Sequence, residues 1–143
     1  MTLDGTNNTD AIFKSEATSA WLTVNADQTF NADGALDQLE SRIALGGNDL
    51  TLNGTNTFSS SITGTSDSNI NLNADLTLDR SGMALYQYEG TVNVNDNTLT
   101  ITGTENTKAK FTGTTDADIS WYAGIMESNG ALNDFNGHIT VGN

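Results

Sequence analysis

The stretch IALGGNDLTLNGT, residues 43–55, decides the fold of this chain. Its alternating apolar residues predict two short strands at 43–45 and 50–52, and its Gly-Gly-Asn-Asp and Asn-Gly-Thr segments predict the turn that follows each strand. The same pattern returns 49 residues later as VNVNDNTLTITGT, residues 92–104. A turn-rich β pattern that recurs at a fixed spacing indicates a repeat protein.

Two further landmarks recur at the same spacing. The alternating segment INLNADLTL at 70–78 predicts a strand with one apolar face, and it has counterparts at 22–30 and, in degraded form, at 119–125. Gly-Thr turns begin at Gly5, Gly54 and Gly103. We therefore interpret the chain as one repeat domain, 1–143, with copies of about 48 residues at approximately 1–42, 43–91 and 92–143.

Residues 34–45 pose an ambiguity that the repeat resolves. Alone, the spacing of their apolar residues would suit an amphipathic helix. The counterparts at 84–94 and 130–141, however, carry Gly and β-branched residues that oppose a helix. One repeat position should have one structure, so all three copies are predicted to form strand, turn, strand.

Each copy contains about six short apolar strand segments. Six segments correspond to two turns of a three-sided coil with ~24 residues per turn, so three copies predict about six coils of an all-β parallel β-helix, or solenoid. A closed threefold β fold, such as a trefoil or β-prism, is the alternative, because threefold repetition is also its signature. Very short strands favour the solenoid, in which each strand pairs with one above and one below.

The composition disfavours several partners. The chain has no Cys, so it can form no disulfide, no thiolate metal site and no nucleophilic cysteine. Its 18 acidic and 5 basic residues give a net charge of −13, which opposes binding to nucleic acid and to anionic membranes. No segment is long and apolar enough for a membrane helix. We therefore expect no nucleic-acid partner and no membrane insertion.

Residues that could carry catalysis are few. His138 is the single histidine, and its alternation with Ile139 predicts an outward, solvated side chain. Asp27 and Asp75 occupy equivalent positions and are expected to stack along the coil; a carboxylate pair could hydrolyse glycosides, but their Asn-Ala-Asp segments favour a turn role. We expect no enzyme, no cofactor, and no catalytic, cofactor-binding or metal-binding residue. Weak calcium binding by Asp and Asn oxygens stays open.

Aromatic residues are the best candidates for contact with a ligand, although the sequence assigns no ligand-binding residue. Tyr86 and Tyr122 fall out of phase with their inward neighbours and should be exposed, where aromatic rings can stack on sugars or partner proteins. Trp121 occupies an inward position and is expected in the core. Asn48 and Asn97 share one repeat position, at which stacked amides could form a hydrogen-bonded ladder.

Residues 43–65, IALGGNDLTLNGTNTFSSSITGT, and residues 88–94, YEGTVNV, resemble the passenger repeats of bacterial autotransporters and related β-solenoid adhesins. The shared form is a strand, a Gly-Asn turn, Leu-Thr-Leu, a Gly turn, and an aromatic residue with a Ser/Gly-rich turn. The resemblance implies a right-handed parallel β-helix on a cell or virion surface, which acts as a stalk or as an adhesive surface in contact with host structures or glycans. A compact threefold carbohydrate-binding module is the alternative.

The two ends of the sequence are in phase with each other. The first residues copy 50–55 and the last residues, 139–143, copy 92–96, so the end of one chain could be continued by the start of another. A solenoid exposes unpaired strand edges at its ends, and no capping segment is apparent. The chain is therefore expected to be either a segment of a longer surface protein or a filament subunit that associates head to tail.

Overall fold

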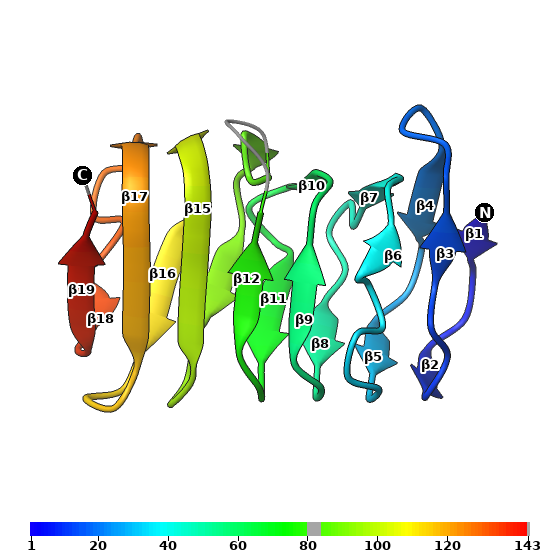
Figure 1. Cartoon of the computed structure of the whole chain (residues 1–143), viewed down its shortest axis with the longest axis horizontal. Coiled ribbons are helices and arrows are strands. Elements are labelled where there is room, and N and C mark those ends of the chain that lie inside the picture. Colours follow the sequence, from blue (N-terminus) through cyan, green and yellow to red (C-terminus); the bar gives the residue numbers. More distant parts are fainter. Residues whose placement is uncertain (80–83, 143) are drawn as a thin grey trace.

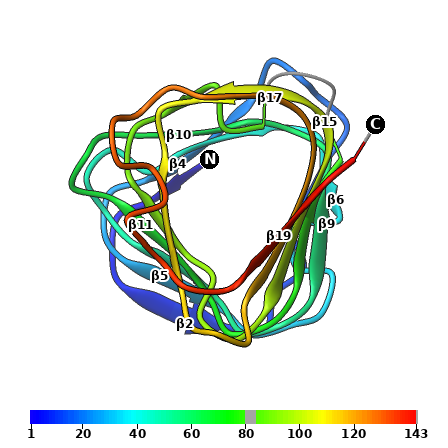
Figure 2. The same cartoon turned by 90° about the vertical axis from the view of Figure 1, so that its left-hand side faces the viewer.

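The computed structural model describes residues 1–79 and 84–142 and forms a β-solenoid of about six coils (Figure 1). Viewed along its length, the solenoid has a three-sided outline (Figure 2). The described residues contain strands and turns but no helix, and therefore no helix that could cross a membrane. The open stack of parallel strands confirms the predicted solenoid and excludes the closed trefoil or β-prism.

Stacked parallel strands form the three faces of the solenoid. The first face contains β1 (Thr2–Leu3), β4 (Trp21–Val24), β7 (Arg42–Ala44), β10 (Ile62–Gly64) and β13 (Gln87–Tyr88). The second face contains β2 (Asn7–Thr9), β5 (Gln28–Phe30), β8 (Leu50–Leu52), β11 (Asn69–Leu72), β14 (Thr91–Asn93), β16 (Lys110–Gly113) and β18 (Asp134–Phe135). The third face contains β9 (Asn56–Phe58), β12 (Leu76–Leu78), β15 (Thr98–Thr107), β17 (Asp118–Met126) and β19 (His138–Val141). The pair β3 (Lys14–Ser15) and β6 (Gln38–Leu39) lies in line with the third face (Figure 1).

Each strand pairs with strands one coil away in the sequence. Ile70 of β11, for example, pairs with Leu50 on one side and with Val92 on the other. Successive coils are about 21 residues apart. Because side chains alternate along a strand, this register stacks apolar residues inside the solenoid and polar residues outside it.

The interior is one continuous apolar cluster. Inward residues from all three faces are excluded from solvent, among them Ile43, Ile62, Leu50, Ile70, Leu78 and Ile101. Trp121 is only 6% exposed, and its ring meets Phe111 edge-on with centroids 5.9 Å apart. The predicted core position of Trp121 is confirmed.

The predicted Gly-Gly-Asn-Asp turn is a corner between two faces. Gly46 has a left-handed φ of 59°, and Asn95, 49 residues later, has a φ of 56°. Glycine and asparagine adopt this conformation more readily than other residues, which explains their presence at this repeated position. The strands that flank the turn, β7 and β8, consequently lie on different faces and do not form a hairpin.

The ambiguous segment has the predicted structure in every copy. Residues 34–45 form β6 and β7, residues 84–94 form β13 and β14, and residues 130–141 form β18 and β19. Strand, turn, strand is therefore confirmed in place of a helix. The three pairs nevertheless lie at three different places around the coil.

The relation between repeat and coil differs from the prediction of two ~24-residue coils per copy. The copy at 43–91 holds seven strands, β7–β13, because the apolar segment from Phe58 to Ile62 contains the end of β9, a corner and the start of β10. Seven strands on a three-sided coil make two coils and one further face. Each copy therefore begins one face further round, and the segments at 22–30, 70–78 and 119–125 start on the first, second and third face.

Candidate functional site

Asp27 and Asp75 have the predicted turn role but do not stack on each other. The Asp27 Oδ1 accepts a hydrogen bond from the N–H of Asp49 at 2.9 Å, and the Asp75 Oδ1 accepts one from the N–H of Thr98 at 2.8 Å. Asp27 lies at the corner between β4 and β5, whereas Asp75 lies at the corner between β11 and β12. Each carboxylate holds the backbone of the following coil, and the two are not brought together as a catalytic pair would require.

His138 points outward, as predicted. Its side chain is 80% exposed, and its Nδ1 lies 3.6 Å from the Asp118 Oδ1. Among residues 1–79 and 84–142, no group of three or more His, Asp or Glu side chains is arranged to hold a metal ion.

Asn48 and Asn97 do not form the predicted ladder with each other. The Asn48 Nδ2 donates to the carbonyls of Val24 and Leu45, both at 2.9 Å. The Asn97 Nδ2 donates in the same way to the carbonyls of Leu72 and Val94. Both amides thus join a corner to the preceding coil through the backbone.

An amide ladder does exist at another outer position. Asn31, Asn53 and Asn73 each donate to the asparagine one coil earlier, at 2.6, 2.7 and 2.8 Å, and Asn95 continues the column at 3.5 Å. The ladder starts at Asn8 in β2 and continues through Asn31, Asn53, Asn73 and Asn95, which lie at the corner after the second face. Its 20- to 23-residue spacing was the sequence signal that could have revealed both the ladder and the coil length.

The predicted exposure of Tyr86 and Tyr122 is confirmed, at 53% and 47%. Tyr86 and its neighbour Gln87 border two hollows on the outer surface. The smaller hollow, about 70 Å³, is also lined by Arg42, Ser61 and Thr63. The larger, about 390 Å³, is also lined by Glu89, Lys108 and Glu127. The two hollows share Tyr86 and Gln87, and we call them together the Tyr86 groove.

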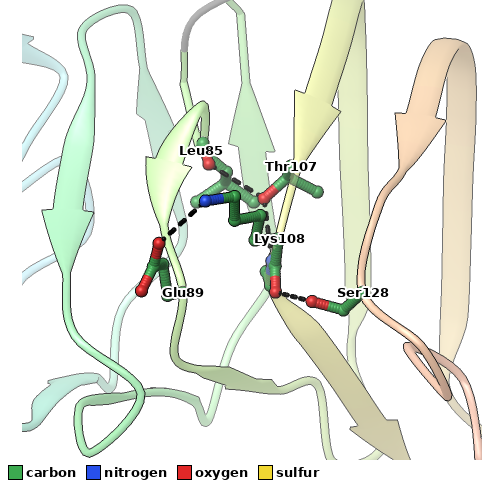
Figure 3. A network of polar contacts seen from close by, with 6 residues as sticks. Leu85, Glu89, Thr107, Lys108 and Ser128 are labelled. Carbon is green, nitrogen blue, oxygen red and sulfur yellow. Dashed lines mark hydrogen bonds and ion pairs between the residues drawn. The ribbon is translucent and has the colours of Figure 1, made fainter.

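One end of the Tyr86 groove contains an ion pair. The Lys108 Nζ lies 3.1 Å from the Glu89 Oε1, and this hydrogen bond raises the pKa of Lys108. Adjacent polar contacts fix the coil beneath it: the Thr107 Oγ1 donates to the Leu85 carbonyl at 2.8 Å, and the Ser128 Oγ donates to the Lys108 carbonyl (Figure 3). The positive charge at this end is therefore already matched by a carboxylate.

The other end of the groove contains an unmatched cation. The guanidinium carbon of Arg42 lies 5.5 Å from the centroid of the Trp21 ring, within the range of a cation–π contact. The Arg42 Nε is buried and has no hydrogen-bond partner among the described residues. Arg42 also has no ion-pair partner in the described part of the chain.

Comparison with known proteins assigns no relatives: no family model, no curated protein and no solved structure matches the chain.

Proposed function

We propose that this chain is a non-enzymatic, structural or adhesive β-solenoid that works outside the cell, on a cell surface or a virion surface. The observation that carries the proposal is the combination of a continuous coil-on-coil rod with an exposed groove along one side. Parallel strands bonded above and below make a rod in which each coil supports its neighbours. The net charge of −13 favours solubility of such an elongated surface.

Localisation provides the direct test. An antibody raised against the folded domain should label intact cells or virions of the organism that makes the protein. An antibody against an internal protein of the same organism is the control and should label only after lysis. Labelling of the domain that also requires lysis would contradict the surface role.

The exposed terminal coils suggest a second part of the proposal. Val141 of β19 is 74% exposed and Met1 is 72% exposed, and an apolar hollow of about 420 Å³ opens beside Phe13 and Leu39 in the first coils. We propose that such surfaces are covered by adjoining coils, either of a longer surface protein or of a second copy in a head-to-tail filament.

Sedimentation velocity at rising protein concentration tests whether a second copy covers these terminal surfaces. A filament predicts species that grow with concentration, and a Val141→Lys substitution should suppress them by placing a charge in the contact. Thr29→Lys adds the same charge on the outer second face, and it should leave the association unchanged. Discrete monomers at every concentration would exclude the filament.

A further inference from the structure

Among residues 1–79 and 84–142, Arg42 has neither a hydrogen-bond partner for its Nε nor an ion-pair partner. A buried donor of a charged group that makes no hydrogen bond destabilises the fold, because it has lost its contact with water without a replacement. The Arg42 Nε is in this position, although the chain carries 18 acidic residues that could have been placed beside it. Instead the guanidinium lies over Trp21, which orients it without neutralising it. No described residue supplies an anion to the guanidinium, and Arg42 lines the adjoining hollow, where an anion bound from outside can reach it.

A carboxylate is the partner that best fits this guanidinium. Arginine presents its N–H groups in a planar fork that matches a carboxylate with two parallel hydrogen bonds. The adjoining hollow of about 70 Å³ is also lined by Ser61, whose hydroxyl can donate to the same anion, and by Thr63, whose hydroxyl donates to the Ile43 carbonyl at 3.4 Å. At the other end of the groove, Glu89 already occupies Lys108 and Glu127 adds a further negative charge. A ligand with one carboxylate and an uncharged remainder therefore suits the groove better than a polyanion.

The middle of the groove suits a sugar ring. Tyr86 exposes 53% of its surface between the two hollows, and an exposed aromatic ring offers a flat apolar face for stacking. Beyond it, the hollow of about 390 Å³ is lined by an amide, two carboxylates and an ammonium, from Gln87, Glu89, Glu127 and Lys108. These groups can donate to and accept from the hydroxyls of a saccharide.

We propose that the Tyr86 groove binds an oligosaccharide with a single carboxylate, placing the carboxylate at Arg42 and a sugar ring against Tyr86. This site rests on the adhesive function proposed above and gives it a ligand class. The ligand would lie along the solenoid axis, because the groove crosses from β7 past β10 and β13 to the end of β15.

The test uses sialyllactose as the acidic probe and lactose as its uncharged comparison, each titrated into the whole chain by NMR. Sialyllactose should shift the Arg42 Nε and Tyr86 ring signals, and lactose should bind at least about tenfold more weakly, since it lacks the charge-assisted hydrogen bonds. Arg42→Gln and Tyr86→Ala should each weaken sialyllactose by at least about tenfold.

Matched controls keep the result specific. Tyr122→Ala removes an equally exposed tyrosine outside the groove, and Lys14→Gln removes an exposed cation elsewhere; both should bind as the wild type. Circular dichroism of each variant confirms that it is folded. Absence of sialyllactose binding, equal binding of lactose, or full binding by Arg42→Gln would each overturn the proposal. Surface labelling in the same experiment series would be unaffected, so failure of this site is distinguishable from failure of the surface role.

Discussion

Two strands of the third face, β12 and β19, share an alternating apolar pattern but differ in burial. Leu76 and Leu78 of β12 are 2% and 1% exposed, whereas Ile139 and Val141 of β19 are 39% and 74% exposed. β12 lies between β9 and β15, while β19 pairs in the described chain with β17 alone. Burial in a solenoid is thus supplied by the adjacent coil, so the same substitution should cost more in the middle than at the end.

Truncation of an inward side chain should give the largest difference in stability between a middle coil and the last coil. Leu78→Ala would leave a cavity in the closed core and should lower the free energy of unfolding by about 2–5 kcal/mol. Val141→Ala removes atoms that are already in solvent and should change it by less than about 0.5 kcal/mol. Urea unfolding followed by circular dichroism measures both. Equal losses would mean that the last coil is covered in solution.

The Gly-Thr corners offer a second matched pair. A Cβ on Gly54 would lie 2.4 Å from the backbone carbonyl of Ala32, whereas a Cβ on Gly5 meets nothing within 4 Å. Gly54→Ala should therefore destabilise the fold by about 1–3 kcal/mol through overpacking. Gly5→Ala should be neutral or stabilising by up to about 1 kcal/mol, since it restricts the unfolded chain. Thermal unfolding of the two variants tests whether contact with the preceding coil is the reason that glycine is needed at this corner. Equal effects at both positions would contradict this explanation.

Tyr88 extends the comparison to a polar group in the core. Its hydroxyl lies 3.1 Å from the carbonyls of Ser68 and Thr91, and its repeat counterpart near the end of the chain, Phe135, has no hydroxyl. Tyr88→Phe should cost about 1–2 kcal/mol at neutral pH, because a buried hydrogen bond is lost.

Alkaline pH provides an independent reading of the same residue. Burial raises the pKa of Tyr88 above the ordinary value of 10.0, so the unfolded chain releases this proton more readily than the folded one. The contribution of Tyr88 to stability is then complete below about pH 10 and is lost as the pH rises further. Urea midpoints between about pH 8 and pH 12 should fall less steeply in Tyr88→Phe than in the wild type. Parallel slopes would contradict the assignment.

The fold was predictable because alternation and turn chemistry are local properties of the sequence. The coil length was not, because one corner carries only a weak turn signal, a run of serines within an apolar segment. Ser59, Ser60 and Ser61 make the corner between β9 and β10 without Gly or Asn, and the Ser60 hydroxyl instead donates to the Glu40 carbonyl at 2.9 Å. In the sequence, β9 and β10 therefore look like one apolar segment, so sequence analysis counts six strands per copy where the structure has seven.

The candidate site could not be predicted without β10, the strand that sequence analysis did not separate from β9. Sequence alone identifies Tyr86 as exposed, but it does not place Arg42 beside it. Arg42, Thr63, Tyr86 and Lys108 come from different coils and meet only when the register of β7, β10 and β13 is known. The burial of the Arg42 Nε without a partner among the described residues is likewise a property of packing, and composition does not reveal it.

The amide ladder should show the smallest difference between middle and end. Asn53 donates to Asn31 at 2.7 Å and accepts from Asn73 at 2.8 Å, whereas Asn8, in the first coil, accepts from Asn31 alone. Asn53→Ala should cost about 0.5–1.5 kcal/mol and Asn8→Ala roughly half as much, since each exposed hydrogen bond contributes modestly. Asn53→Asp keeps the acceptor for Asn73 but loses the donor to Asn31, so its loss should lie between zero and that of Asn53→Ala. Urea unfolding of the three variants measures these losses in the free energy of unfolding. If Asn8→Ala lost as much as Asn53→Ala, the number of hydrogen-bonded asparagine neighbours would not determine the contribution of each asparagine.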